Sequence, residues 1–472
     1  MRKLASVVMV LAACGDDGPV RHLDGGPTDS PEQMIDGMTP QAVTLTVTSN
    51  GTPTPGVKVY FQGVDSSLIS NTTTDATGVA TALMPSGGFV TAVDPYGVPG
   101  GVQTEFHDLY TFSGVKAGDH LVLKDSFSSS TEVTITAPVD GTAGVTGYLF
   151  STPCDREVTV ADGSGAQPSV SLFLDAACAT TTDFLVASLD DAGQVVNWFY
   201  VPNRAVAATV DLTGSTYGAP TVKTYAFTNA PNEFGSVQFA QQFVSTKGTV
   251  VMLQSQAFGK GSPYTGSLPT TPFPGAVDLV QGSASTGSNV MHGFVDWGPF
   301  AATYSTDVGA RMLPEFDVSS IDTTAHALVW TETAAGVTPD FVLSFLSASR
   351  ERQASNLAWS WSIVAPYSGA SVAFPTLPTD IADFAIAPGD GVDLDGVVLG
   401  KVPGGYDALR ANVFNVDGPE SLVTSATGSI TLAQWSAPRI QPETRVQPRR
   451  IRASGFVTGI MREPPARAHR RN

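Results

Sequence analysis

The sequence predicts an all-β protein in which multiple β-sandwich domains follow a disordered tether. Short stretches of alternating apolar and polar residues recur along the chain, which is the pattern of half-buried strands. Turn-forming residues separate these stretches, and the 472 residues include 47 Gly and 33 Pro. Charged residues make up only 14% of the chain, and the sequence has no long amphipathic helical pattern. The net charge of −18 argues against nucleic acid as a partner.

The N-terminus has the features of a cleaved secretory signal. Arg2 and Lys3 come first, an apolar stretch follows, and the run Leu11-Ala-Ala leads to Cys14. A positive start, a short apolar middle and small residues before the cleavage point are typical of such signals. The stretch is too short to span a bilayer as a helix, which takes about 20 residues. Another interpretation is a buried strand or helix that ends in a cysteine.

The run from Leu11 to Cys14 resembles the lipobox of bacterial lipoproteins. This resemblance implies that residues 1–13 form a signal peptide that is removed. It also implies that Cys14 receives a diacylglycerol and usually a further acyl chain, such as palmitate. The mature protein would then be lipid-anchored to the inner or outer membrane of a bacterial cell envelope, facing the periplasm or the exterior.

Both ends of the mature chain are predicted to lack regular structure. Residues 14–40, which contain the lipidated cysteine and a flexible tether, are acidic and rich in Gly and Pro, so they cannot bury enough apolar surface to fold. Residues 439–472 form a basic tail, with nine Arg against Glu443 and Glu463. The tail is predicted to be disordered. It could instead bind phosphates, anionic wall polymers or the acidic body of the protein, or be an error in the gene model.

Residues 41–125 are predicted to form the first β-sandwich. Val43, Leu45 and Val47 alternate with threonines, and Asn50-Gly51 and the segment 75–78 are turn signals. This stretch resembles bacterial Ig-like and carboxypeptidase-regulatory-like modules. The matching residues are Gly51, Pro53, Gly56-Val57, Val59, Phe61, Thr74-Asp75, Gly78, Ala80 and Pro85. The resemblance implies a spacer or binding support rather than a catalytic domain.

Residues 126–215 are predicted to form a second β unit that contains Cys154 and Cys178. If Cys14 is lipidated, these two cysteines remain as a pair, and exported compartments permit disulfides. The alternative is two buried free thiols. Asp190 to Gly193 is expected to form a hairpin turn between two strands of this unit.

Residues 216–438 are predicted to form a larger β domain, in which 259–287 are expected to be long loops because they are rich in Gly, Pro, Ser and Thr. The domain has no HExxH, GxSxG or phosphate-binding glycine motif. His292 and Asp296 lie close enough in sequence for acid–base work, although a packed or surface histidine is the simpler interpretation.

An acidic, glycine-rich segment in the same domain is a weak candidate for a metal site. Asp390, Asp393 and Asp395 offer the carboxylate oxygens that Ca²⁺ binds. Gly391 stands where an EF-hand loop needs an acid, so the segment does not match that family. A solvated turn is the other interpretation, and no cofactor is expected.

Three tryptophans are candidate ligand-binding residues. If the segment around them is a strand, Trp359 and Trp361 share one face, and Trp330 lies a short distance earlier in the chain. Exposed aromatic rings in this arrangement bind sugar rings or peptides, whereas buried ones fill a sandwich core.

These observations favour a membrane-anchored cell-envelope lipoprotein with a non-catalytic binding, adhesion or scaffold role. Its partners would be the membrane, through the N-terminal lipid, and an envelope protein or glycan. The alternative is an envelope hydrolase that acts on glycan or peptide, with its site in 216–438. A purely structural spacer is a third hypothesis.

Overall fold

The structure is a computed structural model, and its described residues all belong to one compact unit that begins at Thr39. It describes residues 39–49, 52–96, 104–125, 130–161, 163–175, 178–231, 236–245, 248–258, 263–285, 289–323, 325–352, 356–415 and 427–435. The predictions for Cys14, the signal, most of the tether, the Asn50-Gly51 turn and the basic tail therefore lie outside the described residues. No helix among the described residues is long and apolar enough to cross a membrane.

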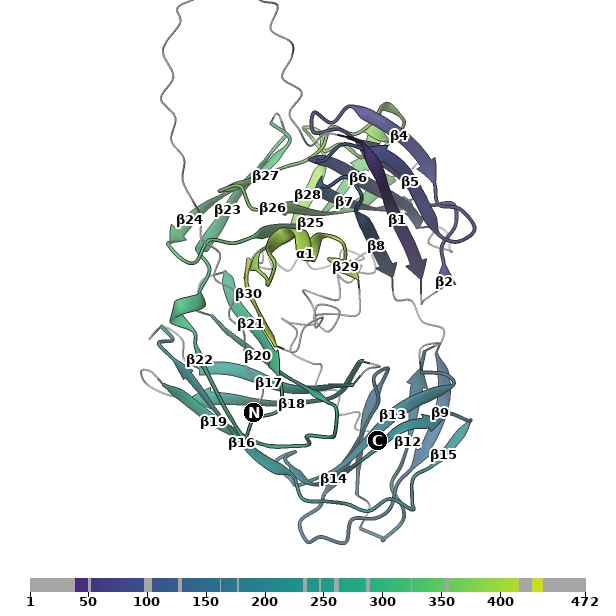
Figure 1. Ribbon diagram of the computed structural model, residues 1–472, viewed down its shortest axis with the longest axis vertical. Coiled ribbons are helices and arrows are strands. Elements are labelled where there is room, and N and C mark those ends of the chain that lie inside the picture. The colour runs from purple at the N-terminus through teal and green to yellow at the C-terminus, as the bar shows by residue number, and fades with distance from the viewer. Residues whose placement is uncertain are drawn as a thin grey trace, which may run out of the picture. The chain divides into compact units, whose positions relative to one another are not determined.

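The described chain is almost entirely β, as the sequence predicts (Figure 1). Its largest sheet has 15 strands, in this spatial order: β22 (Thr303–Asp307), β16 (Thr221–Thr228), β19 (Tyr264–Thr270), β18 (Gly248–Phe258), β17 (Ser236–Ser245), β20 (Val277–Ser285), β21 (Val290–Gly298), β30 (Gly428–Trp435), β28 (Gly391–Lys401), β25 (Phe341–Glu351), β26 (Asn356–Pro366), β7 (Thr104–Val115), β6 (Gly88–Tyr96), β3 (Lys58–Gln62) and β4 (Leu68–Thr73).

Four smaller sheets and three short helices complete the described fold. One sheet has the order β2 (Thr52–Pro53), β1 (Gln41–Ser49), β8 (His120–Asp125) and β29 (Phe414–Asn415), with β5 (Val79–Met84) paired to β1. The second has the order β11 (Arg156–Val160), β10 (Gly147–Ser151), β13 (Thr181–Leu189) and β14 (Val195–Ala205). The others are β12 (Ser169–Leu174), β9 (Thr131–Thr136) and β15 (Thr209–Asp211), and β23 (Glu315–Asp322), β24 (Ala327–Ala334) and β27 (Ser371–Ala373). The helices are α1 (Gly405–Arg410) and the 3₁₀ helices η1 (Gly309–Arg311) and η2 (Thr379–Phe384).

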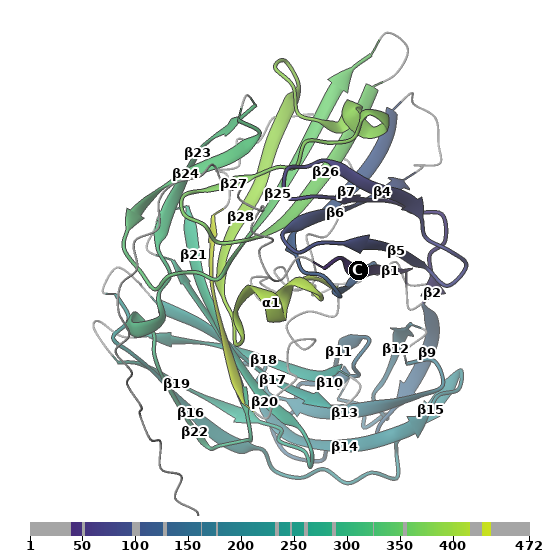
Figure 2. The ribbon, with the colours of Figure 1, turned by 45° about the horizontal axis from the view of Figure 1, so that its top comes forward.

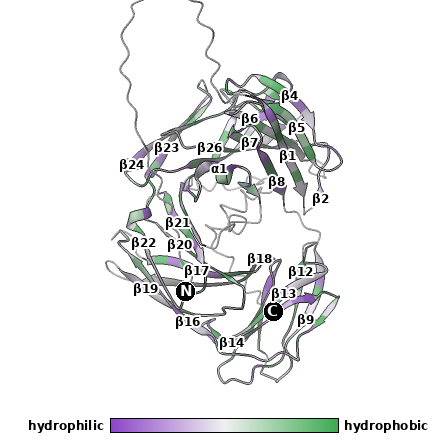
Figure 3. Cartoon of the chain, in the orientation of Figure 1, coloured by the Kyte–Doolittle hydropathy of each residue, from purple (hydrophilic) through white to green (hydrophobic). Residues whose placement is uncertain are grey.

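The strands of residues 41–125 form a β-sandwich. In β1 every second residue is buried, namely Val43, Leu45 and Val47. These side chains share a core with Phe61 of β3 and Phe112 of β7, which belong to the other sheet. Hydrophobic and hydrophilic residues lie within the same strands (Figure 3). In β1 the residues between the buried ones are partly exposed, whereas β3 is buried on both faces, with Phe61 in one core and Tyr60 in another.

The larger sheet of this sandwich continues into strands from residues 216–438. β7 pairs in parallel with β26, with Leu109 opposite Trp361, so the strands β6, β7, β26 and β25 run side by side (Figure 2). The centre of the sheet is covered on both faces. In β25, Phe341 and Leu343 belong to one core and Val342 to another, which explains the uninterrupted apolar run in its sequence.

The second β unit is also a sandwich, and its predicted disulfide is confirmed. Its two sheets, β9–β12–β15 and β10–β11–β13–β14, enclose one core that includes Phe184 and Val186 of β13. Cys154 and Cys178 are bonded, with a Cα–Cα distance of 6.3 Å. The opposite face of β13 presents Leu185 to the core that the strands from β16 to β21 enclose.

Two predicted turns are confirmed, whereas one predicted loop region is wrong. The Asp75 and Asp190 carboxylates each accept backbone N–H bonds from their own turns, and Gly78 and Gly193 both have a φ of 74°. The region 259–287, however, contains β19 and β20. β20 hydrogen-bonds to β17 on one side and β21 on the other, and this pairing outweighs the low strand propensity of residues such as Gly282.

Glycine faces an aromatic ring at three paired positions of the large sheet. Gly282 lies opposite Phe294, Gly400 opposite Phe341, and Gly428 opposite Trp297. A Cβ atom added to any of these glycines would lie 2.0 or 2.1 Å from a ring atom of its aromatic partner. The ring therefore occupies the space of the missing side chain, and the sheet requires glycine here.

Candidate functional site

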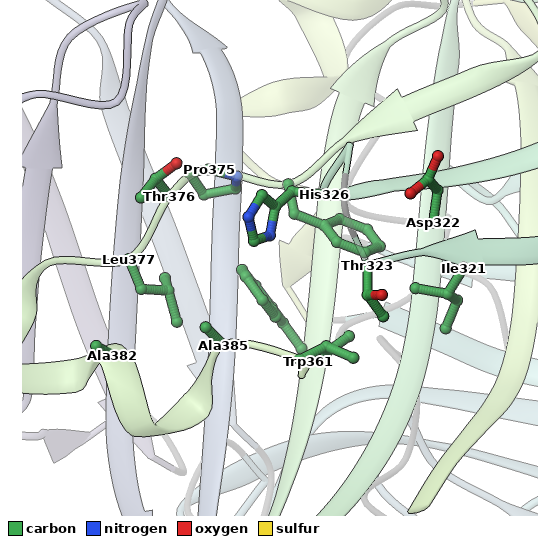
Figure 4. A pocket seen from close by; sticks show the side chains of 12 residues that line it. Ile321, Asp322, Thr323, His326, Trp361, Pro375, Thr376, Leu377, Ala382 and Ala385 are labelled. Atoms are coloured by element: carbon green, nitrogen blue, oxygen red, sulfur yellow. The ribbon is translucent and has the colours of Figure 1, made fainter. Parts of the chain in front are cut away.

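A small cavity opens beside Trp361, between β26, the end of β23, the segment after β27 and η2 (Figure 4). Its volume is about 150 Å³. The floor is apolar and buried, and it consists of Trp361, Phe374, Leu377 and Ile386. The rim is formed by Ile321, Asp322, Thr323, His326, Pro375, Thr376, Ala382 and Ala385.

Trp361 is held in place from two directions. Its indole N–H donates a hydrogen bond of 2.9 Å to the Thr111 hydroxyl on the neighbouring strand β7. Its ring packs against Phe374, with 5.4 Å between the ring centroids. Because its one polar atom is satisfied inside the core, Trp361 presents only apolar surface to the cavity.

Half of the rim side chains are polar, and backbone contacts anchor the rim. His326 has a φ of 49°, in the left-handed region that few non-glycine residues adopt, and its carbonyl accepts a bond of 2.7 Å from the Phe374 N–H. On the other side, the Thr376 carbonyl accepts from the Gln62 side chain at 2.7 Å and its N–H donates to the Ser66 hydroxyl at 3.2 Å. The side chains of Asp322 and Thr376 line the cavity and are exposed, so the cavity opens to solvent beside them.

The size of the cavity restricts what it can hold. Small-molecule sites usually measure about 300–1,000 Å³, so a sugar chain or a cofactor does not fit inside. An apolar cavity of about 150 Å³ is sufficient for one aromatic ring. The cavity is therefore suited to a single apolar or aromatic side chain that enters from outside.

The other two predicted tryptophans are core residues. Trp330 and Trp359 are each 2% exposed and belong to the same hydrophobic core as Trp361. Trp359 packs against Phe384 of η2 and lies under the Arg350 guanidinium, 5.5 Å from the ring centroid. Of the three tryptophans, Trp361 alone lines the cavity.

His292 and Asp296 lie on the same strand, β21, but have different partners. The Nε2 atom of His292 is 3.6 Å from the Glu315 carboxylate, and burial lowers the pKa of His292 although Glu315 opposes this effect. Asp296 binds Arg311 through both oxygens, at 2.8 and 2.7 Å, and accepts a bond of 2.5 Å from the Tyr304 hydroxyl.

The space beside His292 is too small for a substrate. Its volume is about 10 Å³, with Arg311 and Phe294 among the residues that line it. That is approximately the space for a single water molecule.

The three predicted acidic residues do not come together as one group of ligands in the described structure. Asp390 binds the Arg350 guanidinium with two bonds of 2.7 Å. Burial raises the pKa of Asp390, but the bonds from Arg350 and from the Ala387 N–H outweigh burial and lower it overall. Asp393 and Asp395 lie on β28 rather than in a loop. Among the described residues, a set of three metal-ligand types comes together only at Cys154, Asp175 and Cys178, where the two sulfurs are bonded to each other.

Sequence patterns do not point to most of the cavity. Its rim comes from the end of β23 and the turn after it, the segment after β27, and η2 with the residue that follows it. Only Trp361 among its lining residues was a predicted candidate. One local feature could have drawn attention to the rim, which is a histidine in a turn, His326, beside Ala325 and close to Thr323.

No protein-family model matches the chain, and no curated protein sequence matches it. Similar solved structures include the Bacillus anthracis TIE protein, with 14% identity and a TM-score of 0.14 over 57% of this chain and about half (51%) of that one. The tip fimbrial protein Mfa3 from Porphyromonas gingivalis has 10% identity and a TM-score of 0.13 over 38% of this chain and 84% of that one. A streptococcal ancillary pilin has 9% identity and a TM-score of 0.15 over 57% and 98%. At such low identities and TM-scores, these similarities carry no functional conclusion for this chain.

Proposed function

We propose that this protein is a cell-envelope lipoprotein, anchored through Cys14, that binds an envelope protein without catalysis. The cavity beside Trp361 is the observation that carries the binding role. It takes one apolar or aromatic side chain of the partner, and the polar groups of His326, Asp322 and Thr376 stand at its mouth to meet the partner's backbone. A buried apolar pocket for an anchoring side chain, with polar groups at its edge, is a common arrangement at the centre of a binding interface.

The anchor is tested by the intact mass and lipid labelling of the protein purified from its native membrane. A chain that begins at Cys14 and carries acyl groups is the expected result. An unlipidated chain that retains Met1 would contradict both the anchor and the envelope location.

The binding site is tested by selecting displayed random peptides on the full chain. We expect enriched peptides to share one apolar or aromatic residue. Ala382 lies on the cavity rim, so Ala382→Leu adds three carbon atoms there and should weaken binding of these peptides at least tenfold, which corresponds to about 1.4 kcal/mol. The matched control is Ala207→Leu, because Ala207 is exposed in the second β unit.

Equal peptide binding by the wild-type chain and Ala382→Leu would show that the cavity is not part of the binding site.

The hydrolase alternative has its own readout, which is the release of fragments from envelope glycan or peptide. Release that is abolished by His292→Ala would favour the hydrolase over the binding role.

A further inference from the structure

A lysine and an aspartate meet inside the core that the strands from β16 to β21 enclose. Lys223 on β16 is 2% exposed and Asp278 on β20 is 4% exposed. Their Nζ and Oδ2 atoms are 2.5 Å apart. The two strands are not neighbours in the sheet, because β19, β18 and β17 lie between them. The contact therefore connects two distant parts of the same curved sheet.

The surroundings of this pair are apolar and aromatic. The Lys223 Nζ atom lies 5.5 Å from the ring centroids of Tyr225 and Phe300 and 5.7 Å from that of Tyr304. Burial lowers the pKa of the Lys223 ammonium and raises the pKa of the Asp278 carboxyl, while the charge of each partner opposes the shift of the other. Removal from water thus favours the neutral amine and the neutral acid over the ion pair.

The second oxygen of Asp278 is held by hydrogen-bond donors. The Gln241 side-chain amide donates to Oδ1, and the backbone N–H of Ala301 also hydrogen-bonds to this carboxyl. Gln241 is itself oriented by the Tyr225 hydroxyl, which donates to its amide oxygen at 2.8 Å. Donors that point at a carboxyl oxygen stabilise negative charge that develops there when a nucleophile attacks the carbon.

We propose that Lys223 and Asp278 condense into an intramolecular amide, which makes this core a self-cross-linking site. A proton first passes from Nζ to Oδ2, which leaves a neutral amine beside a neutral acid. The Nζ lone pair then attacks Cγ, and the displaced π electrons move to Oδ1, where Gln241 stabilises them. The Cγ–Oδ2 bond breaks, and Oδ2 leaves as water with a second proton from Nζ. The products are one amide and one water molecule, so no oxidant or co-reactant is required.

Two physical factors drive this reaction. Groups held in contact react as if at very high concentration, with effective molarities up to about 10⁵–10⁸ M in favourable cases. The neutral amide also replaces two buried charges whose desolvation is costly. Exclusion of water from a pair that is at most 4% exposed opposes the reverse hydrolysis.

Peptide mapping of the full-length protein by mass spectrometry tests the proposal, because its readout does not depend on processing of the N-terminus. We expect trypsin not to cleave after Lys223. The peptide that contains Lys223 should be joined to the peptide that contains Asp278, and their combined mass should be lower by one water molecule. The exposed pair of Lys401 and Asp340, 3.4 Å apart, is an internal control that should remain unlinked.

Variants separate the reaction from the fold. Lys223→Met and Asp278→Ala should each abolish the linked peptide, and Gln241→Leu should slow its appearance at least tenfold in freshly made protein. If Lys223→Met does not fold, the mapping of the wild-type protein still decides the question. Separate Lys223 and Asp278 peptides of unmodified mass, after prolonged incubation of the folded wild-type chain, would overturn the proposal and leave a non-covalent ion pair.

Discussion

The pair of Gly400 and Phe341 makes the smallest possible side-chain change costly. In Gly400→Ala, the new Cβ would lie 2.0 Å from Cζ and 2.2 Å from Cε1 of the Phe341 ring. Non-bonded carbon atoms pack at about 3.5–4.0 Å, so the ring must move by about 1.5 Å. Phe341 is 0% exposed, and it packs in the core with Leu343 and Val398. The ring therefore has no free space into which it can move.

The expected loss of stability combines two opposing contributions. Overpacking a filled core costs about 1–3 kcal/mol. Replacing glycine also restricts the unfolded chain, which stabilises the folded state by about 0.4–1 kcal/mol. We therefore expect Gly400→Ala to lower the free energy of unfolding by about 1–2 kcal/mol, measured by urea denaturation followed by tryptophan fluorescence.

A control and a double-mutant cycle isolate the contact with the ring. A Cβ added at Gly214 has no atom within 4 Å, so Gly214→Ala should change the free energy of unfolding by no more than about 0.5 kcal/mol. Phe341→Leu removes the ring atoms that the new Cβ would meet. In that background, Gly400→Ala should therefore lower the free energy of unfolding by at least about 0.5 kcal/mol less than it does in the wild-type chain. The same cost in both backgrounds, or no cost at all, would refute the steric argument.

Three further predictions concern other parts of the fold. Reduction of Cys154–Cys178, which are 24 positions apart, should cost about 3.5 kcal/mol by loop entropy. Urea denaturation with and without reductant measures this cost, and a difference under 1 kcal/mol would contradict it. Burial lowers the pKa of His292 in the folded protein below 6.5. Protonation of His292 therefore favours the unfolded chain, so the free energy of unfolding should decline as the pH falls from 6.5 through the lower pKa of the folded state. His292→Phe should flatten the pH dependence of the urea midpoint between pH 7 and 5. Arg311→Met leaves the Asp296 carboxylate without its bidentate partner and should cost about 3 kcal/mol. Lys401→Met in the more exposed pair with Asp340 should cost under about 1 kcal/mol by the same assay.

Local sequence patterns predict strands well where one face is solvated. The alternation at Val43, Leu45 and Val47 is both the signal and the observed burial pattern. The same rule would have located Lys223, because it shares the buried face of β16 with Tyr225 and Phe227. A lysine in phase with buried aromatic residues is an informative pattern, since a charged side chain is rarely buried without a partner.

Contacts between distant segments could not be predicted from these patterns. The hydrogen bond between Trp361 and Thr111 joins residues that are 250 positions apart, and neither neighbourhood shows which strand will pair with it. The cavity beside Trp361 likewise depends on contacts between separate segments, 321–326 and 374–386. For the same reason, His292 and Asp296 are near in sequence, yet each binds a partner from another segment.

Because β7 pairs in parallel with β26, a nascent chain contains β7 long before the strand that pairs with it has been synthesised. When the ribosome has completed β7 at Val115, the strand that covers its outer edge has not been made, because β26 begins at Asn356. An unpaired strand edge invites association with other chains, and such distant pairing is slow to form. The nascent chain therefore needs protection, such as a holding chaperone, until β26 emerges. Chains that terminate before Asn356 should aggregate rather than accumulate as a folded first module.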